Sequence, residues 1–194
     1  MDSVLILSTN INVTTVDEVS QLLQKKNGAT VAVCNVNTLV RSHRNKSLQN
    51  KINSFDVKAP DGFPVAKASS ILYKNQQKRV DGYNIFHKTI ENGIPNELSH
   101  YFFGNDNETI EKLITSLTSS YPDINILGYS CPPYLNFEEL VDDTYIKDIV
   151  EKNPDIVWVS LGFPKQEEFI NLFTRKMHIN SNFVGVGAVF EWSA

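Results

Sequence analysis

Short apolar runs recur along the chain, separated by stretches about as long as one helix. The runs are rich in β-branched and aromatic residues, a composition typical of strands buried on both faces of a parallel sheet. Most of them are followed by a stretch in which apolar residues recur every three or four positions, as on one face of a helix. The runs predicted as strands are 30–34, 55–58, 101–104, 124–128, 156–161 and 183–187.

Helix signals fill the spaces between these strands. Thr15 and Glu18 have the spacing of a capping box, and Gly28 ends the helix that they begin. Strands that alternate with helices imply right-handed crossovers. The predicted fold is therefore α/β, with a Rossmann-like, mostly parallel sheet flanked by helices and a site at the carboxyl ends of the strands. The other predicted helices are about 37–53, 110–117, 137–150 and 165–175.

Length and composition indicate one ordinary globular domain. The chain has 194 residues, of which 41% are hydrophobic and 21% charged. We expect one domain over 1–194, with lobes of about 1–95 and 96–194. A net charge of −4, with no Lys/Arg run longer than two, argues against nucleic-acid binding.

Neither a membrane anchor nor a metal centre is predicted. The chain has no apolar stretch long enough to span a bilayer, and Asp2 stands where a secretory signal would carry a base, so an intracellular protein is expected. Cys34 and Cys131 lie outside any metal-ligand or disulfide spacing and are expected to be small buried residues. The four histidines form no i,i+4 pair, so no histidine metal site is expected.

Polar residues gather where the predicted strands end. Asp61, in a Pro-Asp-Gly tripeptide, is either a turn residue or a carboxylate held as a general base. Gly104, followed by polar residues and a helix, is a place where backbone amides could meet a diphosphate. Residues 162–167 (GFPKQE) begin a helix with groups that hydrogen-bond ribose, uracil or sugar hydroxyls, or form a solvated helix end. Residues 185–187 (GVG) indicate close packing or a cofactor loop.

Three common enzyme classes lack their sequence signatures. There is no GxGxxG motif, no GxxxxGK[ST] phosphate loop and no GxSxG nucleophile elbow. A nicotinamide dehydrogenase, a P-loop enzyme and a serine hydrolase are therefore disfavoured.

As a set, the strand-end motifs resemble those of the WecG/TagA/CpsF family of bacterial glycosyltransferases. The resemblance runs from about residue 12 to the last residue. The motifs that carry it are 35–40 (NVNTLV), 60–64 (PDGFP), 79–82 (RVDG), 102–104 (FFG), 121–123 (YPD), 132–134 (PPY), 162–167 (GFPKQE) and 184–190 (VGVGAVF).

The resemblance implies transfer of a sugar from a UDP-sugar to a polyprenyl-diphosphate-linked saccharide during synthesis of a cell-surface polysaccharide or teichoic acid. The donor sugar would be N-acetylmannosamine, its uronic acid or another hexose, and the acceptor often ends in N-acetylglucosamine. Such enzymes invert the anomeric centre and need neither a cofactor nor a divalent metal. Asp61 occupies the position of the family's catalytic aspartate, and Asn35 and Gln166 match its active-site asparagine and glutamine.

The resemblance also implies a set of binding residues. Arg79 is expected to face a phosphate or to form a surface ion pair, and Glu167 is expected to orient the loop that carries Gln166. The residues expected to shape the nucleotide pocket are Gly104, Asn105, Tyr134, Gly162, Pro164, Gly185, Gly187 and Glu191.

Three departures from the family pattern leave a second reading open. Val33 replaces a threonine that the family often has, and Glu191 replaces its usual aspartate. Family members also continue past the position of Ala194 with an appendage thought to contact the membrane, so we expect a trimmed, poorly active core. The longer form would lie peripherally at the cytoplasmic face of the plasma membrane, and a homo-oligomer is consistent with the family. The alternative is a nucleotide-sugar-binding or regulatory homologue with weak or no turnover.

Overall fold

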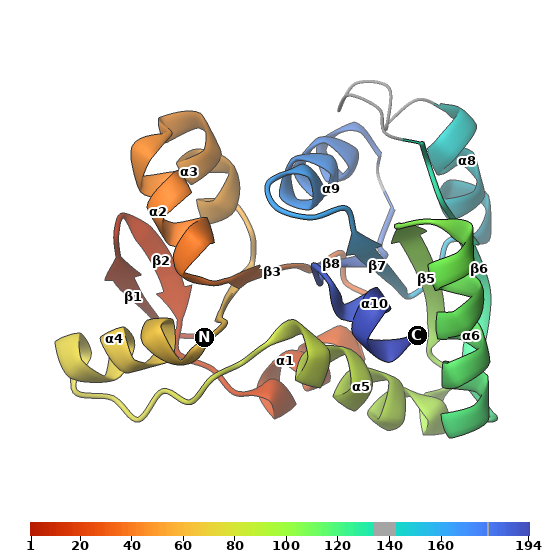
Figure 1. Ribbon diagram of the computed structural model, residues 1–194, viewed down its shortest axis with the longest axis horizontal. Helices are drawn as coiled ribbons and strands as arrows, with labels where there is room; N and C mark the ends of the chain where they lie inside the picture. The colour runs from red at the N-terminus through yellow and green to blue at the C-terminus, as the bar shows by residue number, and fades with distance from the viewer. Residues whose placement is uncertain (134–142, 178) are drawn as a thin grey trace.

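The centre of the molecule is a six-stranded, all-parallel sheet with helices on both faces (Figure 1). The computed structural model describes residues 1–133, 143–177 and 179–194. This architecture confirms the predicted α/β, Rossmann-like fold. In spatial order the strands are β4 (Val57–Pro60), β3 (Thr30–Cys34), β8 (Asn182–Gly185), β7 (Ile156–Ser160), β5 (Ser99–Gly104) and β6 (Asn125–Ser130).

The helices form two layers, and Figure 1 shows α9 on one side of the strands and α1, α5 and α10 on the other. One layer consists of α1 (Val16–Leu23), α5 (Gly82–Gly93), α6 (Asn107–Ser120) and α10 (Val189–Ser193). The opposite layer contains α2 (Val36–Arg44), α3 (Lys46–Asn53), α8 (Asp143–Lys152) and α9 (Lys165–Lys176). The remaining helices are α4 (Phe63–Tyr73) and the 3-10 turn η1 (Ile94–Asn96).

Both faces of the sheet are covered by apolar cores, which explains the continuous apolar runs of its inner strands. Tyr101 and Phe103 of β5 point into one core, whereas Phe102 between them points into the other. Trp158 of β7 is fully buried in the same core as Phe102. Cys34 is also buried, as expected, and has a free thiol.

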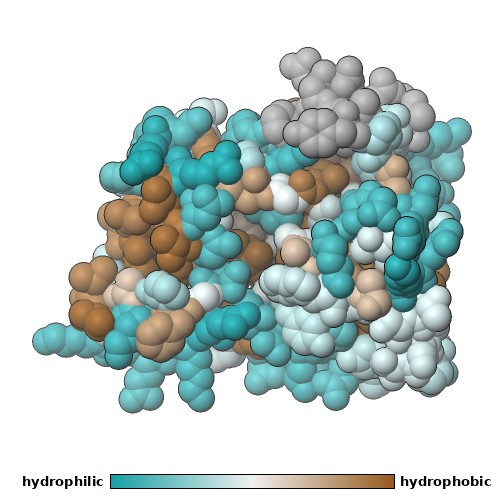
Figure 2. Space-filling model, viewed as in Figure 1, coloured by the Kyte–Doolittle hydropathy of each residue, from teal (hydrophilic) through white to brown (hydrophobic). Residues whose placement is uncertain are grey.

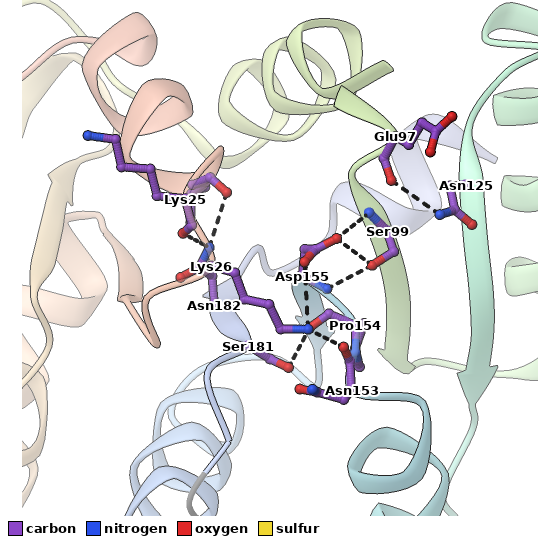
Figure 3. Close-up of polar contacts among 11 residues, drawn as sticks. Lys25, Lys26, Glu97, Ser99, Asn125, Asn153, Pro154, Asp155, Ser181 and Asn182 are labelled. Carbon is purple, nitrogen blue, oxygen red and sulfur yellow. Dashed lines mark hydrogen bonds and ion pairs between the residues drawn. The ribbon is translucent and has the colours of Figure 1, made fainter. Parts of the chain in front are cut away.

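The amino ends of the strands are held together by polar side chains (Figure 3). Asp155 accepts hydrogen bonds from the Ser99 amide (2.9 Å) and hydroxyl (2.6 Å), and its other oxygen lies 3.6 Å from Lys26 Nζ. Asn182 accepts from the Ala29 amide and donates to two carbonyl groups at the end of α1. These polar groups are occupied by structural bonds, so the chemistry must be sought at the opposite edge.

An N-terminal hairpin was not predicted from the sequence. It consists of the antiparallel strands β1 (Ser3–Ile6) and β2 (Thr9–Asn12), which form a sheet of their own. Asn12 joins it to the main sheet by accepting a hydrogen bond from the Lys58 amide at 2.7 Å. The Tyr73 hydroxyl at the end of α4 donates to the Leu5 carbonyl at 2.7 Å. The hairpin and α4 are therefore one structural unit beside β4.

Several predicted boundaries differ from the structure. The helix expected over 37–53 is two helices, because Asn45 has an extended backbone and caps the second one by accepting from the Leu48 amide. Helices α4 and α5 were not predicted. The last predicted strand ends early at Gly185, and α10 follows it. The helix expected over 137–150 lies partly outside the described residues, and its later part is α8.

Candidate active site

Two adjoining pockets lie at the carboxyl edge of the sheet, at the point where the order of the strands reverses. After β3 the chain continues to β4 on one side, whereas after β5 it continues to β6 on the other. Such a switch point is where open α/β sheets bind ligands. The two pockets share Gly162, Gly187 and Ala188 as a common wall.

The smaller pocket, which we call the Asp61 pocket, has a volume of about 290 Å³. The larger, which we call the Glu191 pocket, has a volume of about 430 Å³ and also takes Pro133, Ser160 and Lys165 into its wall. The sequence-predicted residues that line the Asp61 pocket are Asn35, Asp61, Arg79, Gly162, Gln166, Glu167 and Gly187. Those that line the Glu191 pocket are Asn105, Gly162, Gly187 and Glu191.

Three of the predicted site residues that the structure describes line neither pocket. Gly104 and Gly185 are the last residues of β5 and β8. The residue after each of them, Asn105 or Val186, lines a pocket. Pro164 is the residue before α9, and the Phe163–Pro164 peptide bond is cis. Tyr134 lies outside the described residues.

Asp61 is the carboxylate of the smaller pocket. It follows β4, where its amide donates to the Cys34 carbonyl at 3.1 Å. Its carboxylate lies 3.7 Å from Arg79 Nε, and Arg79 is also 3.2 Å from Asp81. Burial raises the pKa of Asp61 above its ordinary value, while Arg79 opposes the rise and Asp81 adds to it. A carboxylate with a raised pKa is a stronger base than an exposed one.

Asn35 supplies a hydrogen-bond donor to the same pocket. Its side-chain oxygen caps α2 by accepting from the Thr38 amide at 3.1 Å. Its exposed side-chain nitrogen has no partner among the described residues. The cap fixes the side chain, so the nitrogen is positioned to donate to a hydroxyl or phosphate oxygen.

Gln166 and Glu167 form a buried hydrogen-bonded chain at the start of α9. Gln166 Nε2 donates to Glu167 Oε1 at 2.8 Å, and Gln166 Oε1 accepts from the Gly187 amide at 3.0 Å. Gln166 lies against Gly185, where a Cβ atom would come within 3.0 Å of its amide nitrogen. The glutamine thus links α9 to the loop between β8 and α10, which is the wall shared by the two pockets.

Glu167 carries an unused polar atom in this wall. The residue is 1% exposed, and its Oε2 is buried without a hydrogen-bond partner among the described residues. Burial raises the pKa of Glu167 from 4.5 to about 7, although the bond from Gln166 opposes the rise. Near neutral pH this group can therefore hold or release a proton beside the Asp61 pocket.

The turn after β5 requires glycine and asparagine for steric reasons. Gly104 has a φ of +107°, and a Cβ there would lie 2.3 Å from the Ser160 carbonyl oxygen. Asn105 follows in the left-handed region and lines the Glu191 pocket. At the start of α6, where the sequence predicts that backbone amides could meet a diphosphate, the Asp106 carboxylate accepts a hydrogen bond from the Thr109 amide at 2.9 Å.

Sequence reasoning missed several residues that belong to the site. Trp192 lines the Asp61 pocket with 66% of its surface exposed, although large aromatic side chains are normally covered. Asp81 caps α5 and pairs with Arg79, and the Arg-x-Asp spacing is the only sequence signal for that pairing. Lys165, which belongs to the predicted 162–167 motif, lines the Glu191 pocket and adds a cation at this edge.

Comparison with known families identifies the kind of protein. The sequence profile described as "Glycosyl transferase WecG/TagA/CpsF family" matches residues 4–194. The chain belongs to this family. The match includes all the strand ends that form the two pockets and confirms the resemblance drawn from their motifs.

Two relatives within the WecG/TagA/CpsF family carry the same name, N-acetylglucosaminyldiphosphoundecaprenol N-acetyl-beta-D-mannosaminyltransferase. The protein of Bacillus subtilis (strain 168) is 28% identical over 171 residues, which are 87% of this chain and 64% of the relative. The protein of Staphylococcus aureus (strain NCTC 8325 / PS 47) is 30% identical over 141 residues, 72% of this chain and 53% of the relative. The chain spans less than two thirds of the length of these relatives.

The two residues that were expected to differ from the WecG/TagA/CpsF pattern both lie in pocket walls. Val33 lines the Asp61 pocket and offers no hydroxyl there. Glu191 lines the Glu191 pocket from α10, next to Trp192.

Proposed function

We propose that this chain carries the catalytic site of an inverting, metal-independent glycosyltransferase. The donor is a UDP-sugar, with N-acetylmannosamine, its uronic acid or a similar hexose as the transferred group. The acceptor is a polyprenyl-diphosphate-linked saccharide. Family membership and the names of the relatives support this class of reaction. The observation that carries the assignment to residues is the partly buried Asp61 carboxylate, with its raised pKa, beside Arg79.

In the proposed reaction Asp61 takes the proton of the acceptor hydroxyl. The hydroxyl oxygen forms a bond to the anomeric carbon as the bond from that carbon to the phosphate oxygen breaks. The attack occurs opposite the leaving UDP, so the configuration at the anomeric carbon inverts. Negative charge builds on the departing diphosphate, and hydrogen-bond donors and cations aimed at it lower the barrier. Lys165, in the wall of the Glu191 pocket, is the cation proposed for this role, whereas Arg79 and the side-chain nitrogen of Asn35, in the Asp61 pocket, are expected to contact the acceptor.

The larger pocket is proposed to hold the nucleotide. Its volume and its glycine-containing wall suit a nucleoside diphosphate whose sugar reaches past Gly187 toward Asp61. The Glu191 carboxylate is expected to accept hydrogen bonds from ribose hydroxyls, and Lys165 to offset phosphate charge.

A UDP-release assay tests the proposal. Purified protein is incubated with each of several UDP-sugars and a short-chain lipid diphosphate saccharide, with and without EDTA. We expect release with one donor, undiminished by EDTA, and a fall of about 10²–10⁴-fold in Asp61→Asn, the range for loss of a general base. The matched control is Asp123→Asn, an exposed aspartate away from both pockets. Full activity in Asp61→Asn would show that another group is the base.

The second candidate, a binding protein without turnover, is favoured by Val33 in the pocket wall. It predicts UDP-sugar binding by calorimetry with no release of UDP from any donor and acceptor pair. Binding that is equal in the wild type and in Asp61→Asn, together with no turnover in either, would support it.

A further inference from the structure

A group of large apolar side chains is exposed on the N-terminal part of the molecule. Figure 2 shows hydrophobic residues gathered at the left of the view, over the β1–β2 hairpin and α4. Phe63 is 72% exposed, and Ile71 and Leu72 are 65% and 64% exposed. Contiguous exposed apolar surface on a soluble domain marks a contact site. We call this surface the N-terminal apolar face; it consists of Leu5, Leu7, Phe63, Ile71, Leu72 and Tyr73.

The residues of the N-terminal apolar face come from two elements that contact each other, α4 and β1. On α4, Phe63, Lys67 and Ile71 are four positions apart and therefore lie along one exposed line of the helix. The helix turns Val65 inward instead. The hydrogen bond from Tyr73 to the Leu5 carbonyl fixes the hairpin beside the end of α4. A helix whose exposed side also carries large apolar side chains has surface left for a partner.

The charge around this face has one sign. Between Gly62 and Val80 the chain has Lys67, Lys74, Lys78 and Arg79 and no acidic residue, although the whole chain has a net charge of −4. Lys67, Lys74 and Lys78 are exposed, and none pairs with an acid within the described residues. Exposed aliphatic and aromatic side chains among unpaired lysines match a lipid surface that bears negative headgroups.

We propose that the N-terminal apolar face docks on an anionic lipid bilayer. Its apolar side chains would enter the headgroup boundary while the lysines contact lipid phosphates. A second copy is the less suitable occupant, because a two-fold contact would place like charges opposite each other. In the part of the chain that the structure describes, no helix is long and apolar enough to cross a bilayer, so the contact is peripheral.

This docking places the Asp61 pocket at the membrane. Phe63 begins α4 two residues after Asp61, the proposed base for the acceptor hydroxyl, so the face borders the Asp61 pocket. An acceptor anchored by a polyprenyl chain would then reach Asp61 without leaving the bilayer. This consequence rests on the proposed function, whereas the docking itself does not.

Vesicle co-sedimentation tests the docking. The full chain is mixed with vesicles of phosphatidylcholine alone, or of phosphatidylcholine with phosphatidylglycerol. We expect binding to the anionic vesicles, a loss of at least tenfold in Ile71→Ser/Leu72→Ser, and a loss of about fivefold per charge in Lys67→Gln/Lys74→Gln. The controls are Val150→Ser and Lys112→Gln, exposed residues on α8 and α6 that should leave binding unchanged. Circular dichroism confirms that each variant is folded.

Several outcomes would overturn the docking. They are no binding to anionic vesicles, equal binding to both vesicle types, or unchanged binding in the Ile71→Ser/Leu72→Ser variant. Light scattering that shows a dimer abolished by that variant, without vesicle binding, would assign the face to a second copy. Vesicle binding with no UDP release would leave the docking intact and refute the proposed function, and UDP release from a soluble acceptor without vesicle binding would do the reverse.

Discussion

Glu167→Gln is expected to make the protein more stable at alkaline pH. In the folded protein burial raises the pKa of Glu167 to about 7, compared with an ordinary value of 4.5. Between these two pH values the folded state binds more protons than the unfolded state, so the free energy of unfolding falls as the pH rises. The difference in pKa corresponds to a loss of about 3 kcal/mol that is complete by about pH 8. Glutamine has nearly the same shape and does not titrate, so the variant avoids this loss.

Urea unfolding of wild type and variant at several pH values measures the effect. The variant should be more stable by about 3 kcal/mol at pH 8 and by less than about 1 kcal/mol at pH 5. Glu168→Gln is the matched control, because Glu168 is the next residue but forms an ion pair with Lys51 at 2.9 Å. Its loss should destabilise the protein by at most about 1 kcal/mol at either pH.

Equal stability of Glu167→Gln and wild type at pH 8 would refute this reasoning, because it would mean that the ionised carboxylate is compensated in the folded state. If the variant is more stable but releases UDP more slowly, the carboxylate is retained for the reaction at the expense of stability.

Three further changes have expected outcomes. Gly104→Ala should lower the free energy of unfolding by about 1–3 kcal/mol in urea titrations, since its methyl group would meet a β7 carbonyl at 2.3 Å; unchanged stability would mean that the turn can relax. Asp155→Ala should cost about 1–3 kcal/mol by leaving the Ser99 amide without its acceptor, and an unshifted urea midpoint would contradict this. Trp192→Phe should remove the acrylamide-quenchable fluorescence, because Trp158 is fully buried; a variant whose fluorescence is still quenched would contradict the exposure of Trp192.

The main sheet could be predicted because strands buried on both faces appear in the sequence as apolar runs. The strands β5 and β7 have no polar position facing solvent, so their apolar runs are unbroken. The β1–β2 hairpin has no such run. Its turn at Leu7 and Ser8 takes positive φ values without glycine or asparagine, so no turn signal separates the two strands.

The α4 helix was missed for a different reason. Its outer face is apolar, with Phe63 and Ile71 exposed, and the periodicity that reveals an amphipathic helix is therefore weak. The predicted helix 37–53 misses the break at Asn45. Asparagine also occurs inside helices, so the residue type does not mark the break, which is visible only in the extended backbone of Asn45.

The location of the candidate site could be predicted, but its internal contacts could not. Polar residues at the strand ends of a parallel sheet must share one edge, so the sequence predicts that Asp61 lies close to residues 162–167, as it does in the Asp61 pocket. Arg79 and Asp81 lie in the segment between α4 and α5. This segment does not follow a strand, so reasoning from strand ends does not predict their pairing. The exposure of Trp192 depends on the packing of α10, for which the sequence has no local signal.

The contact between Gly185 and Gln166 has a consequence for how the family diversifies. The glutamine amide occupies the space that a side chain at 185 would need, and it also bonds to the Gly187 amide. A larger residue at 185 is compatible only with a shorter or displaced one at 166. Across related sequences these two positions should therefore covary, and changing both together should recover stability that the change at 185 alone removes.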